Sequence, residues 1–175
     1  LLAGGTDLLV NLKQPLIPQS SKKKSQVPAF LISLHKLHDL KNIAVHTNGL
    51  LQIGAMANIT SIERSNEIRT AWTALAEGAD TLGSPLVRNR GTLGGNIANA
   101  RPAADMFVPT IAMDGTIVLQ STQGQRRVSA KDFATGPGVT IRLNHEIITS
   151  IEYPPLPPHS ASAYYKLANR KALEI

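Results

Sequence analysis

The segment Arg90-Gly91-Thr92-Leu93-Gly94-Gly95-Asn96-Ile97-Ala98-Asn99 decides how this chain is interpreted, together with Leu2-Ala3-Gly4-Gly5-Thr6-Asp7-Leu8 about ninety positions earlier. Each segment combines adjacent glycines with polar residues. Because glycine has no Cβ, its backbone can take positive φ and bring N–H groups close to an anion. Two such segments, each beside an apolar stretch, predict a ligand with two neighbouring phosphates that is held from both sides.

Neither segment has a common phosphate-binding fingerprint. The chain has no G-x-x-x-x-G-K-[ST], and no G-x-G-x-x-G followed by an acidic residue about twenty positions later. Either segment alone also fits an ordinary tight turn. The second segment, however, lies inside a block of special-geometry residues, 83–105, with no charge run and no low complexity. Ordinary turns do not extend this far, so the block favours a binding site.

Through these residues the chain resembles the FAD-binding subunit or domain of the molybdenum hydroxylases. That family includes xanthine dehydrogenase and the medium subunit of aerobic carbon monoxide dehydrogenase. The resemblance runs in the family's order through residues 3–9, 83–105, 147–152 and 164–168. One residue departs from it, because Arg101 stands where the family usually carries a serine.

The resemblance implies an α+β domain of the FAD-binding PCMH type, with two α/β subdomains and FAD between them. We expect residues 1–47 to form the first subdomain, which is N-terminally incomplete, and residues 48–153 the second. Residues 154–175 are expected to hold a Pro-rich linker and the start of a C-terminal domain. The chain begins at Leu1 without a methionine, so we expect it to be a central fragment.

The function implied by the resemblance is that of an FAD-containing oxidoreductase subunit in a molybdopterin dehydrogenase complex. The substrate would be oxidised on a molybdopterin-binding large subunit. Electrons would reach FAD through a small two-iron two-sulfur subunit and pass to NAD or another acceptor. A cytoplasmic location is expected. The flavin supplies the electron chemistry and the protein supplies binding and tuning, so no catalytic residue of its own is expected.

The implied cofactor site draws on both glycine segments and on four further positions. Backbone N–H groups of the two segments would hold the diphosphate, Asp105 would contact the cofactor, and Lys166 would lie near the flavin ring. Asp105 could instead be an acid in the first turn of a helix, Lys166 a surface lysine, and the two apolar residues plain core. The expected cofactor-binding residues are Leu2, Ala3, Gly4, Gly5, Thr6, Asp7, Leu82, Thr92, Leu93, Gly94, Gly95, Asn96, Asp105, Ile148 and Lys166.

The amino-acid composition limits which kinds of protein and binding site are possible. Of 175 residues, 42% are hydrophobic and 17% charged, which is typical of a globular chain. The chain has no cysteine, which excludes disulfides, thiolate zinc sites and cysteine-bound clusters within this polypeptide. Its histidines lack metal-site spacing, so no metal site is expected. No apolar run approaches the eighteen or so residues that a membrane span needs.

Two alternatives of other classes stay open. The first is a self-contained FAD-dependent reductase resembling UDP-N-acetylenolpyruvoylglucosamine reductase. The second is a basic nucleic-acid-binding module, because the net charge is +6. The basic residues are scattered, however, and aromatic content is only 4%, so we expect no nucleic-acid partner. The run Lys22–Lys24 fits a solvated loop or a surface that docks an acidic partner subunit. Arg88 and Arg90 would contact phosphate or a partner, or flank a helix in solvent.

Local patterns predict an α+β mixture of elements. Asn48-Gly49 predicts a β-hairpin between residues 43–45 and 50–53. Thr60 and Glu63 match a capping box. Gly83 is expected to end an amphipathic helix over residues 71–82. The other expected elements are a buried strand at 1–3, a helix at 7–13 that Asp7 could cap, a strand at 30–33, a helix at 103–113 with Asp105 in its first turn, a hairpin of 116–120 with 125–129, a strand at 146–152 and an irregular linker at 153–159.

Overall fold

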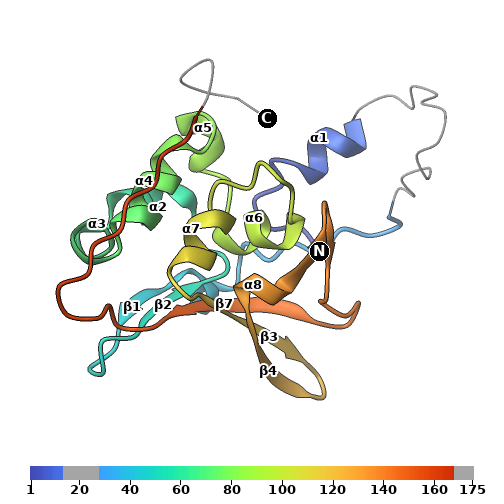
Figure 1. Ribbon diagram of the computed structural model, residues 1–175. Helices are drawn as coiled ribbons and strands as arrows, with labels where there is room; N and C mark the ends of the chain where they lie inside the picture. The colour runs from blue at the N-terminus through green and yellow to red at the C-terminus, as the bar shows by residue number, and fades with distance from the viewer. Residues whose placement is uncertain (14–27, 168–175) are drawn as a thin grey trace.

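The computed structural model describes residues 1–13 and 28–167 (Figure 1). Its centre is a five-stranded sheet in the order β1-β2-β7-β3-β4, in which every neighbouring pair is antiparallel. Helices lie over one face of this sheet, above it in Figure 1. The strands of the sheet are β1 (Ile43–Val45), β2 (Leu51–Gly54), β3 (Thr116–Ser121), β4 (Gly124–Ser129) and β7 (Ile147–Tyr153). The expected α+β fold class is confirmed.

Short helices supply the second layer. They are α1 (Leu8–Lys13), α2 (Ile59–Arg64), α3 (Asn66–Ala71), α4 (Thr73–Thr81), α5 (Pro85–Arg88), α6 (Leu93–Asn99), α7 (Phe107–Ala112) and α8 (Ala130–Phe133), with a 3-10 helix, η1, at His38–Lys41. A second small sheet pairs β5 (Ala134–Gly136) with β6 (Val139–Thr140). In the described parts of the chain, no helix is long and apolar enough to cross a membrane.

Both predicted hairpins are present. β1 pairs with β2 so that Ile43 faces Ile53, and Gly49 in the turn has a φ of +82°, which explains the Asn-Gly signal. β3 and β4 are joined by a shorter turn, since Ser121 pairs with Gly124, and β7 forms the expected final strand. β1 lies before residue 47 and β2 after it, although they are neighbours in one sheet. The division at residues 47 and 48 therefore stays a prediction.

The core lies between the sheet and the helices. Ile53 on β2 and Ile117 on β3 both lie opposite Ile151 on β7, and all three are fully buried in one cluster with helix residues such as Leu75 and Ile97. This is the burial expected for a sheet with one face covered by helices. The last strand ends at Tyr153, whose hydroxyl forms a 3.0 Å hydrogen bond with Thr110 inside the core. That bond ties α7 to the sheet.

Two helix predictions were wrong in detail. The residues 58–71 form two helices, and Asn58 rather than Thr60 caps the first, accepting from the Ser61 N–H at 2.7 Å. Ser65 caps the second. The helix predicted over 103–113 is shorter in the structure, where α7 spans Phe107–Ala112. Asp105 therefore precedes the helix instead of lying in its first turn. The helix over 71–82 is confirmed as α4, and Gly83 follows it with a φ of +54°.

The N-terminal strands are also reduced. Leu2 forms one parallel bridge with Ser33, and neither expected strand extends further. Leu1 is 58% exposed and Phe30 85% exposed, so the segment is not buried as predicted. The expected helix is α1, but the Asp7 carboxylate bonds Asn99 of α6. The run Lys22–Lys24 and residues 168–175, named in the sequence analysis, lie outside the described residues.

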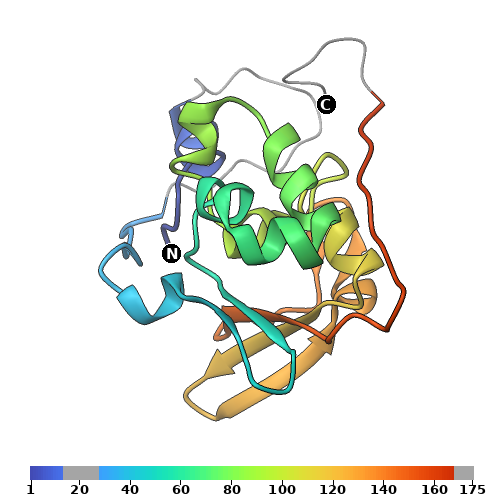
Figure 2. The same ribbon diagram turned by 90° about the vertical axis from the view of Figure 1, so that its left-hand side faces the viewer.

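Residues 154–167, called the C-terminal strap below, contain no helix or strand, in agreement with the predicted linker over 153–159. Figure 2 shows the strap rising from the end of β7 past the helical layer. Proline is frequent at its start, and proline cannot donate to a strand ladder or a helix. The chain therefore leaves the sheet here and crosses to the helices.

Candidate functional site

The two glycine segments are in direct contact. A Cβ at Gly4 would overlap the carbonyl oxygen of Arg90 and lie 3.0 Å from the Cα of Gly91. A Cβ at Gly95 would lie 3.8 Å from that of Ala3. Only glycine permits so close an approach of two backbones. The structure therefore brings together the segments that the sequence analysis singled out.

The first segment presents a row of backbone donors. Its start is fixed, since Leu2 donates to the Ile32 carbonyl at 2.8 Å and accepts from Leu34 at 2.9 Å. The chain then turns at Gly5, which has a φ of +77°. Among the described residues, the backbone N–H groups from Gly4 to Asp7 have no hydrogen-bond acceptor. Consecutive free N–H groups around a positive-φ glycine form a concavity suited to an anion.

The second segment is helical, which the sequence analysis did not predict. It forms the start of α6, and Thr92 caps this helix by accepting from the Gly95 N–H at 3.1 Å. The N–H groups of Leu93, Gly94 and Asn96 donate to the carbonyls of Ala57, Ala55 and Thr92. These donors already have acceptors inside the protein. The segment thus supports the first one by close packing rather than by offering free backbone N–H groups.

Asp7 links the two segments through side chains. Its carboxylate accepts from Asn99 Nδ2 at 2.9 Å, and its other oxygen lies 4.0 Å from the Arg101 guanidinium. Both charged side chains are about half exposed, at 55% for Asp7 and 49% for Arg101. Arg101, the departure from the family pattern, therefore offsets the negative charge of Asp7 beside the free N–H groups.

Asp105 and Lys166, which the sequence analysis singled out separately, form an ion pair. Lys166 Nζ lies 2.8 Å from one Asp105 carboxylate oxygen and 3.0 Å from the other. The Tyr164 hydroxyl donates to the same carboxylate at 3.1 Å. Asp105 is only 8% exposed, so it is a buried carboxylate that accepts hydrogen bonds from two donors. It makes no cap bond to α7, which removes the helix-cap interpretation.

Asn96 joins this acid to the glycine segments. Its side-chain oxygen accepts from the N–H of Met106, the residue that follows Asp105, at 3.3 Å. The Asn96 side chain therefore ties α6 to the backbone next to Asp105. The apolar members differ, because Leu82 and Ile148 both lie in the main hydrophobic core, 9% and 7% exposed. Their contact with a cofactor stays a prediction.

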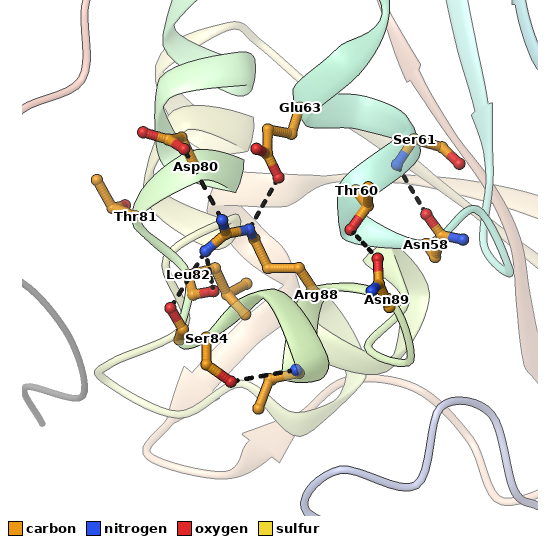
Figure 3. A network of polar contacts seen from close by, with 12 residues as sticks. Asn58, Thr60, Ser61, Glu63, Asp80, Thr81, Leu82, Ser84, Arg88 and Asn89 are labelled. Carbon is orange, nitrogen blue, oxygen red and sulfur yellow. Dashed lines mark hydrogen bonds and ion pairs between the residues drawn. The ribbon is translucent and has the colours of Figure 1, made fainter.

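Arg88 does neither of the things that the sequence suggested. Its side chain is 12% exposed and pairs with Glu63 at 2.8 Å. Figure 3 shows the guanidinium surrounded by Glu63, Asp80 and the turn after α4, whose carbonyls at Leu82 and Gly83 it approaches at 3.4 and 3.2 Å. Arg88 is thus a partly buried structural residue whose side chain contacts the turn at Leu82 and Gly83. Arg90 is exposed, and its carbonyl contacts Gly4.

Sequence reasoning missed Tyr164 and Asn99 as site residues. Tyr164 lies two positions before Lys166, and in an extended chain such residues share a face. That spacing is the one signal that could have suggested it. Among the described residues, no group of three or more His, Asp or Glu side chains is placed to hold a metal ion.

The family described as the FAD binding domain in molybdopterin dehydrogenase matches residues 1–156. The nicotinate dehydrogenase FAD-subunit of Eubacterium barkeri is 36% identical over 178 residues, which cover 100% of this chain and 57% of that protein. The xanthine dehydrogenase FAD-binding subunit of Escherichia coli O157:H7 is 32% identical over 176 residues, again 100% and 57%. The chain thus spans somewhat over half the length of these relatives.

A solved structure gives the same relationship. The carbon monoxide dehydrogenase of Hydrogenophaga pseudoflava, in a form lacking the Mo-pyranopterin moiety of its cofactor, superimposes with a TM-score of 0.87 at 30% identity. The match covers 98% of this chain and 56% of that one. Sequence and fold therefore point to the same relatives.

Proposed function

Because this chain belongs to the family of FAD binding domains in molybdopterin dehydrogenase, whose cofactor is FAD, we propose that its two glycine segments form the diphosphate part of the FAD site. The observation that carries the proposal is the row of free backbone N–H groups from Gly4 to Asp7. Such donors need no side-chain charge to bind an anion, and hydrogen bonds to a charged acceptor are the stronger kind.

The remaining residues have distinct roles in this proposal. Gly91 and Gly95 would let the second segment approach the first one, and Gly94 would let α6 pack against Ala55, so that the donors of the first segment are held in place. The Asn96 side chain and Thr6 hydroxyl offer further polar contacts. Bound FAD supplies the electron-accepting and electron-donating chemistry. Asp105 would accept a hydrogen bond from the cofactor, and Lys166 would place a cation beside it.

We further propose that the whole protein acts as the electron-transfer subunit of a molybdenum-containing dehydrogenase complex. Support comes from relatives that are named as FAD subunits or medium chains of such dehydrogenases. The chain has no cysteine with which to bind an iron–sulfur cluster. In this proposal electrons arrive from a two-iron two-sulfur partner subunit and leave to NAD or another acceptor, while a molybdopterin-binding subunit oxidises the substrate.

The first test is to identify the flavin. The purified intact protein should be yellow and should release FAD, not FMN, on denaturation, because a nest of this length suits a diphosphate better than one phosphate. FMN, or no flavin after reconstitution, would contradict the proposal. Co-purification with an iron–sulfur and a molybdopterin subunit would support the complex. NADPH-dependent reduction of a sugar nucleotide without partners would instead favour the self-contained reductase.

A further inference from the structure

The C-terminal strap is fastened to α4 at two points. Ser162 Oγ accepts from the N–H of Ala74 at 3.1 Å, in the first turn of α4, where Trp72 makes no side-chain cap bond. One turn later, Glu77 accepts from the N–H of Tyr164 at 2.6 Å. The first N–H groups of a helix have no partner within the helix. Ser162 therefore completes α4 from outside and fixes where the strap runs.

Beyond these two anchor points, the side chains of the strap are alternately turned inward and exposed to solvent. Tyr165 and Leu167 are 90% and 93% exposed, whereas Tyr164 and Lys166 turn inward and donate to Asp105. Because alternate residues of an extended chain point to opposite sides, the anchor at Glu77 determines which residues face the site. The register of the strap is thus matched to one buried carboxylate.

Lys166 and Tyr164 differ in how well they can set the orientation of the Asp105 carboxylate. The Lys166 side chain is flexible and ends in a compact charge, so it attracts the Asp105 carboxylate without setting the orientation of that carboxylate. Tyr164 has a rigid ring, and its own backbone is bonded to Glu77. Burial, and then the negative charge of Asp105, raise the pKa of Tyr164 to about 12. Its hydroxyl therefore remains a donor over the working pH range.

We propose that Tyr164 is a positioning residue for the cofactor: its hydroxyl holds the Asp105 carboxylate in the orientation in which it meets FAD. The inference rests on the proposed function, since it presumes that Asp105 contacts FAD. It assigns Tyr164 a role that acts through Asp105 and not through direct contact with the flavin. The strap then contributes both an orienting residue and a countercharge to one acid.

The test compares two tyrosine variants that lose the same atom. Tyr164→Phe should raise the FAD dissociation constant roughly tenfold, about 1.4 kcal/mol, because one hydrogen bond to a charged group is lost. The absorption spectrum of bound flavin should also shift. Tyr165→Phe, an equal change at an exposed neighbouring position, should alter neither. An unchanged dissociation constant and spectrum in Tyr164→Phe would overturn the inference, even if the apoprotein melts at a lower temperature.

A double-mutant cycle tests the route through Asp105. In an Asp105→Asn background, Tyr164→Phe should weaken FAD binding by much less than in the wild type, because the two residues act as a pair. Equal effects in both backgrounds would show that Tyr164 acts independently, which contradicts the inference. Wild-type protein that takes up no FAD would overturn the proposed function itself. Wild-type uptake with a silent Tyr164→Phe would overturn only the positioning role.

Discussion

Gly4 packs against the backbone carbonyl of Arg90, with no room for even a methyl group between them. The two residues are more than eighty positions apart, yet this contact sets the distance between the first glycine segment and the chain that enters α6. A backbone carbonyl cannot rotate aside as a side chain can. The geometry of the free N–H groups therefore depends on the absence of a Cβ at residue 4.

Gly4→Ala should consequently impair both stability and FAD binding. Overpacking of this kind typically costs about 1–3 kcal/mol, and shifting the first segment would misplace its donors. Urea unfolding of the apoprotein and FAD titration measure the two effects. Gly136→Ala is the matched control, because a Cβ there would meet nothing within 4 Å. Equal FAD affinities in the two variants would show that the contact does not shape the site.

Arg101→Ser should weaken FAD binding modestly, by less than about fivefold, because half-exposed ion pairs contribute at most about 1 kcal/mol. The physical reason is that Arg101 offsets the Asp7 charge beside the bound diphosphate. The difference from wild type should shrink as salt is raised, and Arg101→Lys should retain most of the affinity. A loss that is independent of salt, or equal in the serine and lysine variants, would argue against an electrostatic role.

The hairpins and the main amphipathic helix could be predicted because their signals are local. Asn48-Gly49 specifies a turn, and the burial of Leu51 and Ile53 on β2 follows from the pairing of β2 within the sheet. Capping was less predictable, since Asn58 and Thr60 are both good caps. Asn58 is the cap because it forms an antiparallel β-bridge with Thr92. This bridge holds the Asn58 backbone extended at the start of α2. A contact thirty-four positions away therefore decides a local choice.

The glycines of the second segment show the same limitation. Adjacent glycines oppose a helix, so the sequence favoured a loop with positive φ. The structure has Gly94 and Gly95 in α6, and neither has positive φ. A Cβ at Gly94 would lie 2.6 Å from that of Ala55, and a Cβ at Gly95 would lie 2.8 Å from Thr92 Oγ1. Close packing and the cap explain these glycines, which no local pattern could reveal.

Motifs singled out several residues that lie together in the structure, but not the polar partners that come from distant segments. Asp105 and Lys166 were expected from the resemblance, and they are paired. Tyr164 reaches Asp105 across 59 positions, and Asn99 reaches Asp7 across 92. Neither spacing has a periodicity that a single sequence could reveal. Only the folded chain shows which polar groups meet.

Arg88→Met should be among the most destabilising single changes in the helical layer. The Arg88–Glu63 pair is only 12% and 17% exposed, so removing the guanidinium takes a hydrogen bond from a mostly covered carboxylate, which costs about 1.5–3 kcal/mol. The turn at Leu82 and Gly83 would also lose its donor. The control is Arg127→Met, whose side chain is 56% exposed and pairs with Glu152, and we expect less than about 1 kcal/mol there. Similar unfolding free energies for the two variants would contradict the buried role of Arg88.

Glu146 should make stability depend on acid pH. Hydrogen bonds from Arg126 on β4, followed by one from the Leu143 N–H, lower the pKa of this buried carboxyl from about 4.5 to about 2. Because the pKa is lower in the folded state, the pair stabilises the fold at pH values above the unfolded value near 4.5. This contribution is lost progressively as pH falls from about 4.5 through about 2, and the carboxyl is protonated in both states only below that folded-state pKa.

The measurement is the unfolding free energy of wild type and Glu146→Gln between pH 7 and pH 2. We expect the variant to be less stable at pH 7, because Arg126 loses its counter-ion, and to lose less stability than wild type between pH 4.5 and pH 2. The two curves should therefore converge at the acid end. Asp114→Asn, which removes one exposed carboxyl elsewhere, serves as the control and should follow the wild-type curve. Parallel curves for wild type and Glu146→Gln would show that Glu146 has the same pKa in both states, and that the ion pair with Arg126 does not form in solution.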